Sequence, residues 1–346
     1  MPSKALIALA AVTALSVVAA AVAVHQRAVA TAQGRSGEPL LPGLMDRIND
    51  VATIRLQRAD GPLTLEFEDG HWRLAEKGGY PARFEAVKTA LVALARLRTI
   101  EAKTAKPALY PKLEVEDPGQ AGAKSTLMTL FDAAGTQLAS IIVGKTRDGS
   151  LGIGRAGVYV RRPGEARAWL AEGDPKLPDE AAGWLDQKLV NIARDRVAAA
   201  VLSQPDGTEI EISREHKEQK DFTLSPMPEG HKIKSAFSVN SITWVPERLI
   251  FDDVRRADDV DFTAAEAREA TFRSFDGLIL RLTLAPKDGE IWARMEASAA
   301  EDAAPEMAEE AAEITARTEG WAFRFSELKV ENLTTLLADL VEPEKG

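Results

Sequence analysis

The chain has 346 residues, of which 45% are hydrophobic and 28% are charged, a composition typical of one large or two medium globular cores. A formal net charge of -10 disfavours nucleic acid as a partner, because phosphate backbones repel an acidic protein. The absence of cysteine excludes disulfides, thiolate metal sites and cysteine nucleophiles, and leaves the redox compartment open.

A long apolar run lies close to the N-terminus. Residues 5–24, from Ala5 to Val24, carry no charge, and as a helix rising ~1.5 Å per residue they would cover the ~30 Å hydrocarbon core of a bilayer. Lys4 precedes the run, and the slight charge bias favours a cytoplasmic N-terminus. The sequence therefore predicts a single-pass inner-membrane anchor within residues 1–30, with the C-terminal body in the periplasm.

A cleaved signal peptide is the alternative interpretation of the same segment. Ala28-Val29-Ala30 has the small-x-small pattern of a cleavage site. The apolar run exceeds the ~7–15 residues of a signal-peptide core, which favours retention of the anchor. Both interpretations export the body. Residues 31–43 are polar and rich in Gly and Pro, as expected of a linker.

The body begins with a strand pattern. Apolar residues alternate with a period of two over residues 54–56, 63–67 and 72–74, and Asp-Gly pairs between them favour tight turns. Gly79-Tyr80-Pro81-Ala82 reads as a turn into a helix, because Phe84, Val87, Leu91 and Leu94 then form one apolar stripe. Further elements are predicted as strands at residues 127–131, 140–143 and 158–160 and a helix at residues 184–192.

A similar order of patterns starts again near residue 197. Asp206-Gly207 follows Asp60-Gly61 by 146 positions, which favours domain duplication over a short solenoid repeat. The sequence therefore predicts an α+β fold, with an N-terminal transmembrane helix followed by two tandem, similar antiparallel-sheet-plus-helix repeats. The repeats are placed at residues 44–194 and 195–346.

The second repeat carries its own strands, a helix and an insertion. Strands are predicted at residues 278–284, 291–295 and 321–325, and a C-terminal helix after Ser326, its expected N-cap. Residues 296–316 form an acidic insertion rich in Ala and Glu, interpreted as a solvated segment or a mobile helix. An acidic docking arm for a basic partner is the alternative.

Two motifs have the residue types of a binding site. The glycines at 152, 154 and 157 match a dinucleotide fingerprint, but a strand at 158–160 follows where a helix is required, so a hairpin turn is favoured. A cluster of carboxylates could offer hard oxygen ligands to calcium or magnesium: Asp252, Asp253, Asp258, Asp259 and Asp261. Arg255 and Arg256 interrupt the cluster, which favours a solvated loop.

The remaining chemistry-bearing residues form no catalytic pattern. His25, His71, His216 and His231 are too scattered for a zinc site, and no nucleophile elbow or phosphate-binding loop occurs. The six tryptophans fall within strand or helix patterns and are expected in the core. The sequence thus predicts no enzyme, no cofactor, no metal and no catalytic residue.

Several short motifs resemble one protein family. They are Trp72-Arg73-Leu74, Gly79-Tyr80-Pro81-Ala82, Tyr110-x-x-Leu113 with Asp117-Pro118, Val143-Gly144-Lys145, Tyr159-Val160-Arg161, Trp321-Ala322-Phe323 and Leu336-Leu337-Ala338-Asp339-Leu340. The chain resembles a family of bacterial envelope proteins with a domain of unknown function, found beside auxiliary components of gliding-motility-type ABC transporters. The resemblance implies a tethered periplasmic body near an exporter and carries over no catalytic residue.

The expected function is that of a non-enzymatic, membrane-anchored periplasmic accessory or scaffold protein of an ABC-type export or envelope complex. Its expected partners are the inner membrane, through residues 5–24, and a membrane protein complex. The alternative is a binding module for a small molecule, lipid or glycan in a cleft between the two repeats. A scaffold requires an exposed apolar patch, whereas a ligand binder requires an apolar cavity with a few polar groups.

Overall fold

The computed structural model describes residues 37–147, 156–204 and 206–344, and they fold into two compact units. Unit 1 comprises the chain up to Trp72 together with Phe84–Leu177. Unit 2 comprises Arg73–Arg83 and the chain from Pro178 onward. The chain therefore passes between the units three times, and the short segment Arg73–Arg83, here named the strap, folds with unit 2.

Unit 1 is built on an antiparallel sheet with the strand order β3-β2-β1-β6-β7-β8-β9-β5, and the two-residue strand β4 (Tyr80–Pro81) of the strap pairs with β3 at one end of this order. Its strands are β1 (Val51–Arg58), β2 (Gly61–Glu68), β3 (His71–Leu74), β5 (Arg98–Ala102), β6 (Thr126–Asp132), β7 (Gln137–Arg147), β8 (Gly157–Arg161) and β9 (Ala168–Glu172). Residues 37–40 run beside β5, where Leu40 N donates to Leu97 O at 2.8 Å. This pairing covers the open edge of β5, which would otherwise present unpaired backbone groups.

The first hairpins of unit 1 follow from the alternation in the sequence. Ile54 and Leu56 are buried and pair with Leu65 and Leu63 of β2. The turn between β2 and β3 has positive φ at both Asp69 (50°) and Gly70 (80°), the conformation that a two-residue hairpin requires. The three predicted N-terminal strands are therefore confirmed.

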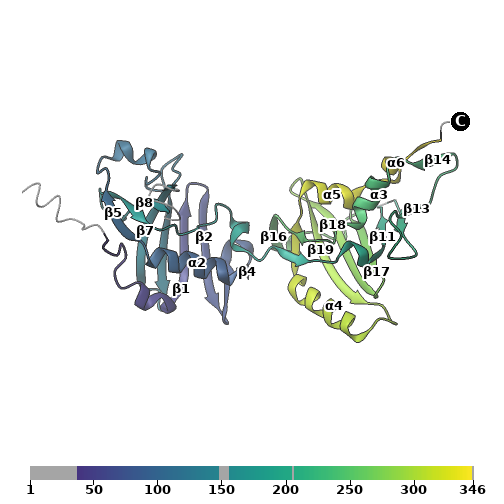
Figure 1. The fold of residues 1–346 in the computed structure, drawn as a ribbon, viewed down its shortest axis with the longest axis horizontal. Helices are drawn as coiled ribbons and strands as arrows, with labels where there is room; N and C mark the ends of the chain where they lie inside the picture. The colour runs from purple at the N-terminus through teal and green to yellow at the C-terminus, as the bar shows by residue number, and fades with distance from the viewer. Residues whose placement is uncertain (1–36, 148–155, 205, 345–346) are drawn as a thin grey trace, which may run out of the picture. The chain divides into compact units, whose positions relative to one another are not determined.

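The helices of unit 1 are few. They are η1 (Met45–Asp50), α2 (Phe84–Ala95) and η3 (Pro107–Lys112), the η elements being 3-10 helices. Helix α2 is confirmed at the predicted position and lies across one face of the sheet (Figure 1). Val87, Leu91 and Leu94 of its predicted stripe are buried, whereas Phe84 is 57% exposed.

Unit 2 has a second antiparallel sheet, with the strand order β13-β12-β11-β17-β18-β19-β20-β16. Its strands are β11 (Val197–Ser203), β12 (Glu209–Ser213), β13 (Thr223–Ser225), β16 (Asp253–Arg256), β17 (Arg268–Ser274), β18 (Leu278–Lys287), β19 (Glu290–Ala299) and β20 (Trp321–Arg324). Four further strands form two small antiparallel ribbons, β10 (Lys188–Val190) with β15 (Leu249–Ile250) and β14 (His231–Ile233) with β21 (Val341–Pro343).

Unit 2 also carries most of the helices. They are η2 (Ala75–Lys77) in the strap, η4 (Ala181–Trp184), η5 (Arg194–Arg196), α3 (Ala236–Thr243), η6 (Ala257–Asp259), α4 (Pro305–Thr318), α5 (Glu327–Thr334) and α6 (Leu337–Leu340). The helix α4 packs on β19 through Ala311 and Ile314, which are 4% and 5% exposed.

The predicted fold class is wrong. The protein is mostly β-sheet with few helices, and not an α+β fold of sheet-plus-helix repeats. Residues 184–192 are the end of η4 followed by β10, and the predicted C-terminal helix is two short helices, α5 and α6. Short apolar runs give the same periodicity signal in a strand and in a buried helical turn, which accounts for these errors.

The predicted tandem repeats are not shown either. The two sheets have corresponding strand orders, but the α4 helix between β19 and β20 has no counterpart between β8 and β9. The division between the units falls after Leu177, whereas the sequence placed it after residue 194. The strap comes from the N-terminal half of the chain but belongs to unit 2, so no single cut of the chain separates the two units.

No helix in residues 37–147, 156–204 and 206–344 is long and apolar enough to cross a membrane. The predicted anchor at residues 5–24 and residues 31–36 of the predicted linker at 31–43 lie outside the described residues.

The strap is fixed in unit 2 by one buried aromatic side chain. Tyr80, in the two-residue strand β4 (Tyr80–Pro81), is 2% exposed. Its ring meets Trp321, Phe251 and Phe323 edge to face, with centroid distances of 4.9, 5.3 and 6.1 Å. Such aromatic pairs add stability beyond the area they bury. The predicted turn before α2 is present, but its tyrosine belongs to the core of unit 2.

Backbone and charged contacts complete the attachment of the strap. Arg83 N donates to Trp184 O at 2.7 Å, and Arg256 Nε donates to Gly78 O at 3.0 Å. Lys77 forms an ion pair with Asp253 at 2.5 Å. Because Asp253 and Arg256 belong to β16, the edge strand of the second sheet, the strap shields that edge from pairing with other chains.

We expect Tyr80→Ala to destabilise unit 2 by about 3–5 kcal/mol, the range for removing a large aromatic side chain from a core. Hydrogen exchange followed by mass spectrometry should show faster exchange in the peptides of β16 and β20, whereas the peptides of β6 and β7 in unit 1 serve as the internal reference. Unchanged protection of β16 and β20 would show that the strap does not depend on this side chain.

Tyr80→Phe is the matched control, because it keeps the ring and removes only the hydroxyl, whose bond to Asp186 O is long at 3.5 Å. Burial, followed by the charge of Asp186, raises the pKa of Tyr80 above its ordinary value. Above about pH 10 the unfolded chain therefore releases this proton first, and wild-type stability falls as the pH rises. Tyr80→Phe should lack this contribution to alkaline unfolding.

Candidate functional site

An apolar groove lies on the surface of unit 1. The groove, here named the aromatic groove, has a volume of 330 Å3 and is lined by Ile48, Asn49, Val51, Phe67, Trp72, Phe84, Lys88, Leu91 and Val92. This volume lies at the lower end of the range for sites that hold small ligands.

Three elements of the chain position the walls of the groove. The hairpin of β2 and β3 brings Phe67 and Trp72 together, with ring centroids 5.4 Å apart. Helix α2 contributes Phe84 and Lys88 from its first turns, and η1 contributes Ile48. Trp72 is buried, whereas Phe67 and Phe84 are 44% and 57% exposed and form the rim.

The electrostatics of the groove are simple. Among the described residues that line it, Lys88 is the only charged one. Its ammonium lies 5.9 Å from the centroid of the Phe84 ring and 3.4 Å from Glu85 Oε1. The apolar lining is therefore suited to holding an apolar group.

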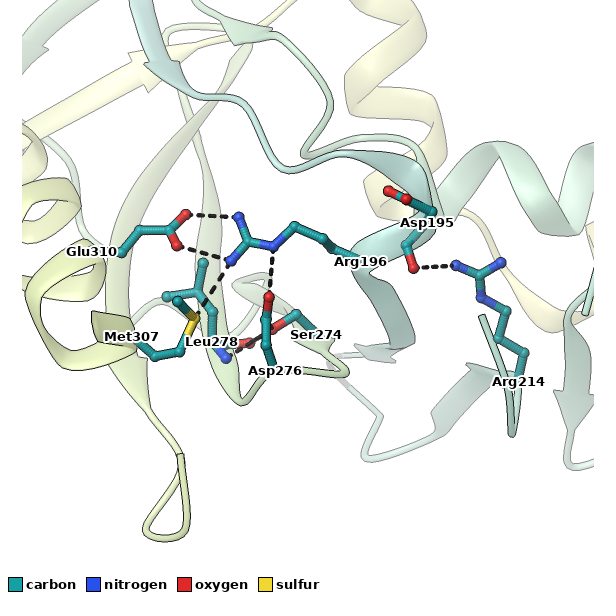
Figure 2. Close-up of polar contacts among 8 residues, drawn as sticks. All are labelled: Asp195, Arg196, Arg214, Ser274, Asp276, Leu278, Met307 and Glu310. Carbon is teal, nitrogen blue, oxygen red and sulfur yellow. Dashed lines mark hydrogen bonds and ion pairs between the residues drawn. The ribbon is translucent and has the colours of Figure 1, made fainter. Parts of the chain in front are cut away.

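A second cluster, in unit 2, consists of charged side chains around Arg196 (Figure 2). The guanidinium binds Glu310 through two hydrogen bonds of 2.8 and 3.0 Å and Asp276 through one of 2.8 Å. Ser274 donates to the other oxygen of Asp276 and accepts from Leu278 N at 2.8 Å. Each member of the Arg196 cluster is thus bound to another part of the fold, and Arg196 joins α4 to the turn between β17 and β18.

The protonation of the Arg196 cluster follows from these bonds. Hydrogen bonding to Glu310 is the largest cause that raises the pKa of Arg196. Burial acts to raise the pKa of Asp276, but hydrogen bonds from Ser274 and Arg196 hold it below its ordinary value. Both shifts favour the charged forms of Arg196 and Asp276, as an ion pair requires.

Arg214 stabilises the neighbouring loop in a similar manner. It donates to the carbonyl oxygens of Arg194, Asp195 and Val197 at 2.8, 3.0 and 3.0 Å, and the bond to Asp195 is visible in Figure 2. Its guanidinium lies 4.7 Å from the centroid of the Phe222 ring. Burial lowers the pKa of Arg214. The carbonyl groups that surround this cation indicate a structural role.

The Arg196 cluster bears on the interpretation of residues 296–316. This segment comprises the end of β19 and most of α4, a helix whose residues are mostly exposed and which is buried along one side. Thr318 Oγ1 donates to Met295 O at 3.1 Å and is completely buried, while Glu310 binds Arg196. The acidic composition concealed an amphipathic helix with a narrow buried side of Ala311, Ile314 and Thr318.

A third cluster, in unit 1, unites several motifs of the family resemblance. Arg161 is 4% exposed, lies 4.6 Å from the centroid of the Tyr110 ring, and forms an ion pair with Asp117. It also donates to Val115 O at 2.9 Å, and the Tyr110 hydroxyl donates to Ala166 O at 2.6 Å. These residues fasten the loop of η3 to the sheet.

Gly144 explains the Val-Gly-Lys motif in β7. A Cβ atom at this position would collide with Leu113 O and lie 2.5 Å from Glu114 O. The neighbouring Lys145 N donates to Leu113 O at 3.0 Å. The glycine is therefore required because the backbone after η3 lies directly against β7.

Four of the five aspartates at 252–261 are exposed, as the solvated interpretation expects, and Asp253 alone is half-buried. Asp253 begins β16 and pairs with Lys77, while Asp261 accepts from Thr263 N at 2.9 Å. Arg255 and Arg256 each lie 4.1 Å from a tryptophan ring, that of Trp292 and that of Trp321. A polar cavity of 340 Å3 adjoins this strand. Nowhere in the described chain do three or more His, Asp or Glu side chains come together as a metal site.

The remaining candidates lie apart from one another. Residues 152–155 of the glycine motif are outside the described residues, and Gly157 begins β8, which pairs with β7 as the hairpin interpretation requires. His71 and His231 each contact the carbonyl two residues earlier, and His25 is outside the described residues. Five of the six tryptophans are buried, as expected of core residues, and the sixth, Trp244, is half-buried.

Sequence reasoning did not identify the aromatic groove. Phe67 and Phe84 were assigned to half-buried patterns, and only their exposure in the folded chain sets them apart. The detectable signal was that each pattern carries a large aromatic residue at its end, where the strand or helix meets a turn.

The protein is thus of a mostly β class, with two units and an apolar groove in the first. Residues 72–273 match the family described as a domain of unknown function (DUF4340), which is more than half of the chain. The chain belongs to this family. No curated protein matches the chain. No solved structure matches it either.

We expect Gly144→Ala to destabilise unit 1 by about 1–3 kcal/mol, the usual effect of forcing an atom into a packed region. The loss should appear in urea unfolding of the full chain and as faster hydrogen exchange around η3. Gly119→Ala is the matched control, because a Cβ there meets nothing within 4 Å. Equal stability of the two variants would contradict the close approach described here.

We expect Arg196→Met to loosen α4, because it leaves Glu310 and Asp276 without their cation at a cost of about 1–3 kcal/mol. Hydrogen exchange of the α4 amides measures this effect. Arg281→Met is the control, since Arg281 is half exposed and its ion pair with Glu269 contributes little. Protection of α4 that is the same in both variants would refute a role for Arg196 in holding the helix.

Proposed function

We propose that this protein is a non-enzymatic accessory protein of a bacterial envelope, with its body on the periplasmic side of the inner membrane. The uncharged stretch at residues 5–24 supports export and contact with that membrane. The resemblance to envelope proteins found beside ABC transporters supports a membrane protein complex of this kind as the partner. The net charge of -10 is consistent with a role that does not involve nucleic acid.

The aromatic groove is the observation that carries this proposal. The groove is open to solvent, and Phe67 and Phe84 are exposed at its rim. Exposed apolar side chains that lie together on a surface indicate a binding site. A pocket that receives one apolar anchor is a common centre of a binding surface. The groove thus gives an accessory protein a specific attachment point.

The charged clusters support a binding role over a catalytic one. Arg161, Arg196 and Arg214 are the most extensively bonded cations of the described chain, and their partners are carbonyl groups and carboxylates of the same unit. Catalytic groups instead have a free position directed at the substrate. These arginines are therefore accounted for by the stability of the fold.

A ligand-binding module is the second candidate function, and the groove in unit 1 is the site that supports it. The sequence placed such a cavity between two repeats, whereas the groove lies wholly within unit 1. Its apolar walls with two polar side chains, Asn49 and Lys88, have the composition of a small-ligand site.

In-cell photocrosslinking tests the accessory function. A photoreactive phenylalanine analogue at position 84 of the full chain should form a crosslink to a membrane protein of the envelope. Position 237 is the matched control, because Phe237 is an aromatic residue of similar exposure, at 68%, in unit 2. The crosslinked partner is identified by mass spectrometry.

Crosslinks from position 84 that are the same as those from position 237, or are confined to cytosolic proteins, would overturn the proposal. An alkaline phosphatase fused to the C-terminus controls for compartment, because the enzyme becomes active only outside the cytosol.

A further inference from the structure

The occupant of the aromatic groove is constrained first by its polar groups. A peptide segment brings an N–H and a C=O group with every residue, and each requires a partner when buried. Of the described residues that line the groove, only Asn49 and Lys88 have polar side chains. An occupant with a long apolar part and one polar end satisfies this lining better than a peptide does.

The charge of the groove constrains that polar end. Lys88 is the single charged lining residue, so the field in the groove favours an anion. Its neighbour Glu85 is 3.4 Å away, but the two side chains are 56% and 70% exposed. Exposed pairs of this kind are weak, and the ammonium of Lys88 is therefore available to an incoming anion.

The aromatic rim constrains the shape of the occupant. Phe84 and Phe67 are exposed above the buried Trp72, and the space they enclose with Leu91 and Val92 is 330 Å3. This space suits a single slender chain rather than a polycyclic or branched ligand, because larger ligands occupy sites toward 1,000 Å3.

We infer that the aromatic groove binds the acyl chain of an anionic amphiphile, whose carboxylate or phosphate end lies at Lys88. This inference rests on the proposed function, because a body at the membrane surface is supplied with such molecules by the bilayer. Burial of apolar area provides the affinity, and each further buried methylene should tighten binding about fourfold until the groove is full. Lys88 sets the preference for an anionic end and the direction in which the chain lies.

Photolabelling of the full chain in phosphatidylcholine nanodiscs tests this inference. Two probes share one twelve-carbon chain with a diazirine and differ only in their end group, a carboxylate or an amine. The carboxylate probe should label the peptides that contain η1 and the first turns of α2, in a saturable manner, about two- to fivefold more than the amine probe. Mass spectrometry of the digested protein locates the label.

Two variants make the test specific. Lys88→Glu should reverse the preference between the probes, and because Lys88 is largely exposed the variant should fold as the wild type does. Lys124→Glu is the control, because it makes the same charge change at an exposed position of unit 1 outside the groove. It should leave the preference unchanged.

Equal labelling by the two probes, labelling outside the groove, or a preference unaffected by Lys88→Glu would overturn the inference. If the groove is not labelled while position 84 still crosslinks to a membrane protein, the acyl chain is refuted and the accessory function stands. If the groove is labelled and position 84 crosslinks to no protein, the ligand-binding candidate replaces the accessory function.

Discussion

The burial of Tyr80 among Trp321, Phe251 and Phe323 is the constraint on which the division of this chain depends. The tyrosine lies only four residues before α2 of unit 1, yet its ring completes the core of unit 2. The chain must therefore leave unit 1 after β3, supply the strap to unit 2 and return to form α2. Any account of how the units fold has to include this early contribution of the N-terminal half to the second core. The edge strand β16 depends on the same segment, since Arg256 and Asp253 are bonded to the strap.

Three arginines, of which Arg161 is buried and Arg196 and Arg214 are half-buried, fix loops and a helix in the same way. Arg161 holds the loop of η3, Arg196 holds α4 and Arg214 holds the segment around Asp195, each through carbonyl or carboxylate groups of its own unit. A charged group removed from water is stable only when such partners replace its hydration. The hydrogen-bonding groups of these three guanidinium ions are thus used in holding the fold together.

The sequence was informative where one periodicity dominated. The hairpin of β1 and β2, the turn at Asp69-Gly70, helix α2 and the long strands β18 and β19 all follow from alternation and turn chemistry. It was uninformative where an apolar side chain had two cores available, because nothing local distinguishes a Tyr80 that packs in unit 1 from one that packs in unit 2. The sequence does not predict the short strands β5 and β9, whose patterns are weak, and it offers the helix α4 only as one of two interpretations of an acidic segment. Phe67 and Phe84 follow half-buried patterns, so nothing in the sequence sets them apart as the rim of a groove.

Local rules fail most informatively at that rim. In β2 the alternation buries Leu65 and should bury Phe67, and in α2 the stripe buries Val87 and should bury Phe84, yet both aromatic rings are exposed. An apolar residue that follows the pattern and still faces water loses the free energy that burial would provide. Natural sequences depart from their hydrophobic pattern mainly at functional or strained sites. Two such departures, at Phe67 and Phe84, lie at one groove and are therefore a stronger indication of function than either alone. Lys88 is the charged residue among those described in the lining, and its position beside Phe84 makes one end of the groove polar, which a merely imperfect core would not require.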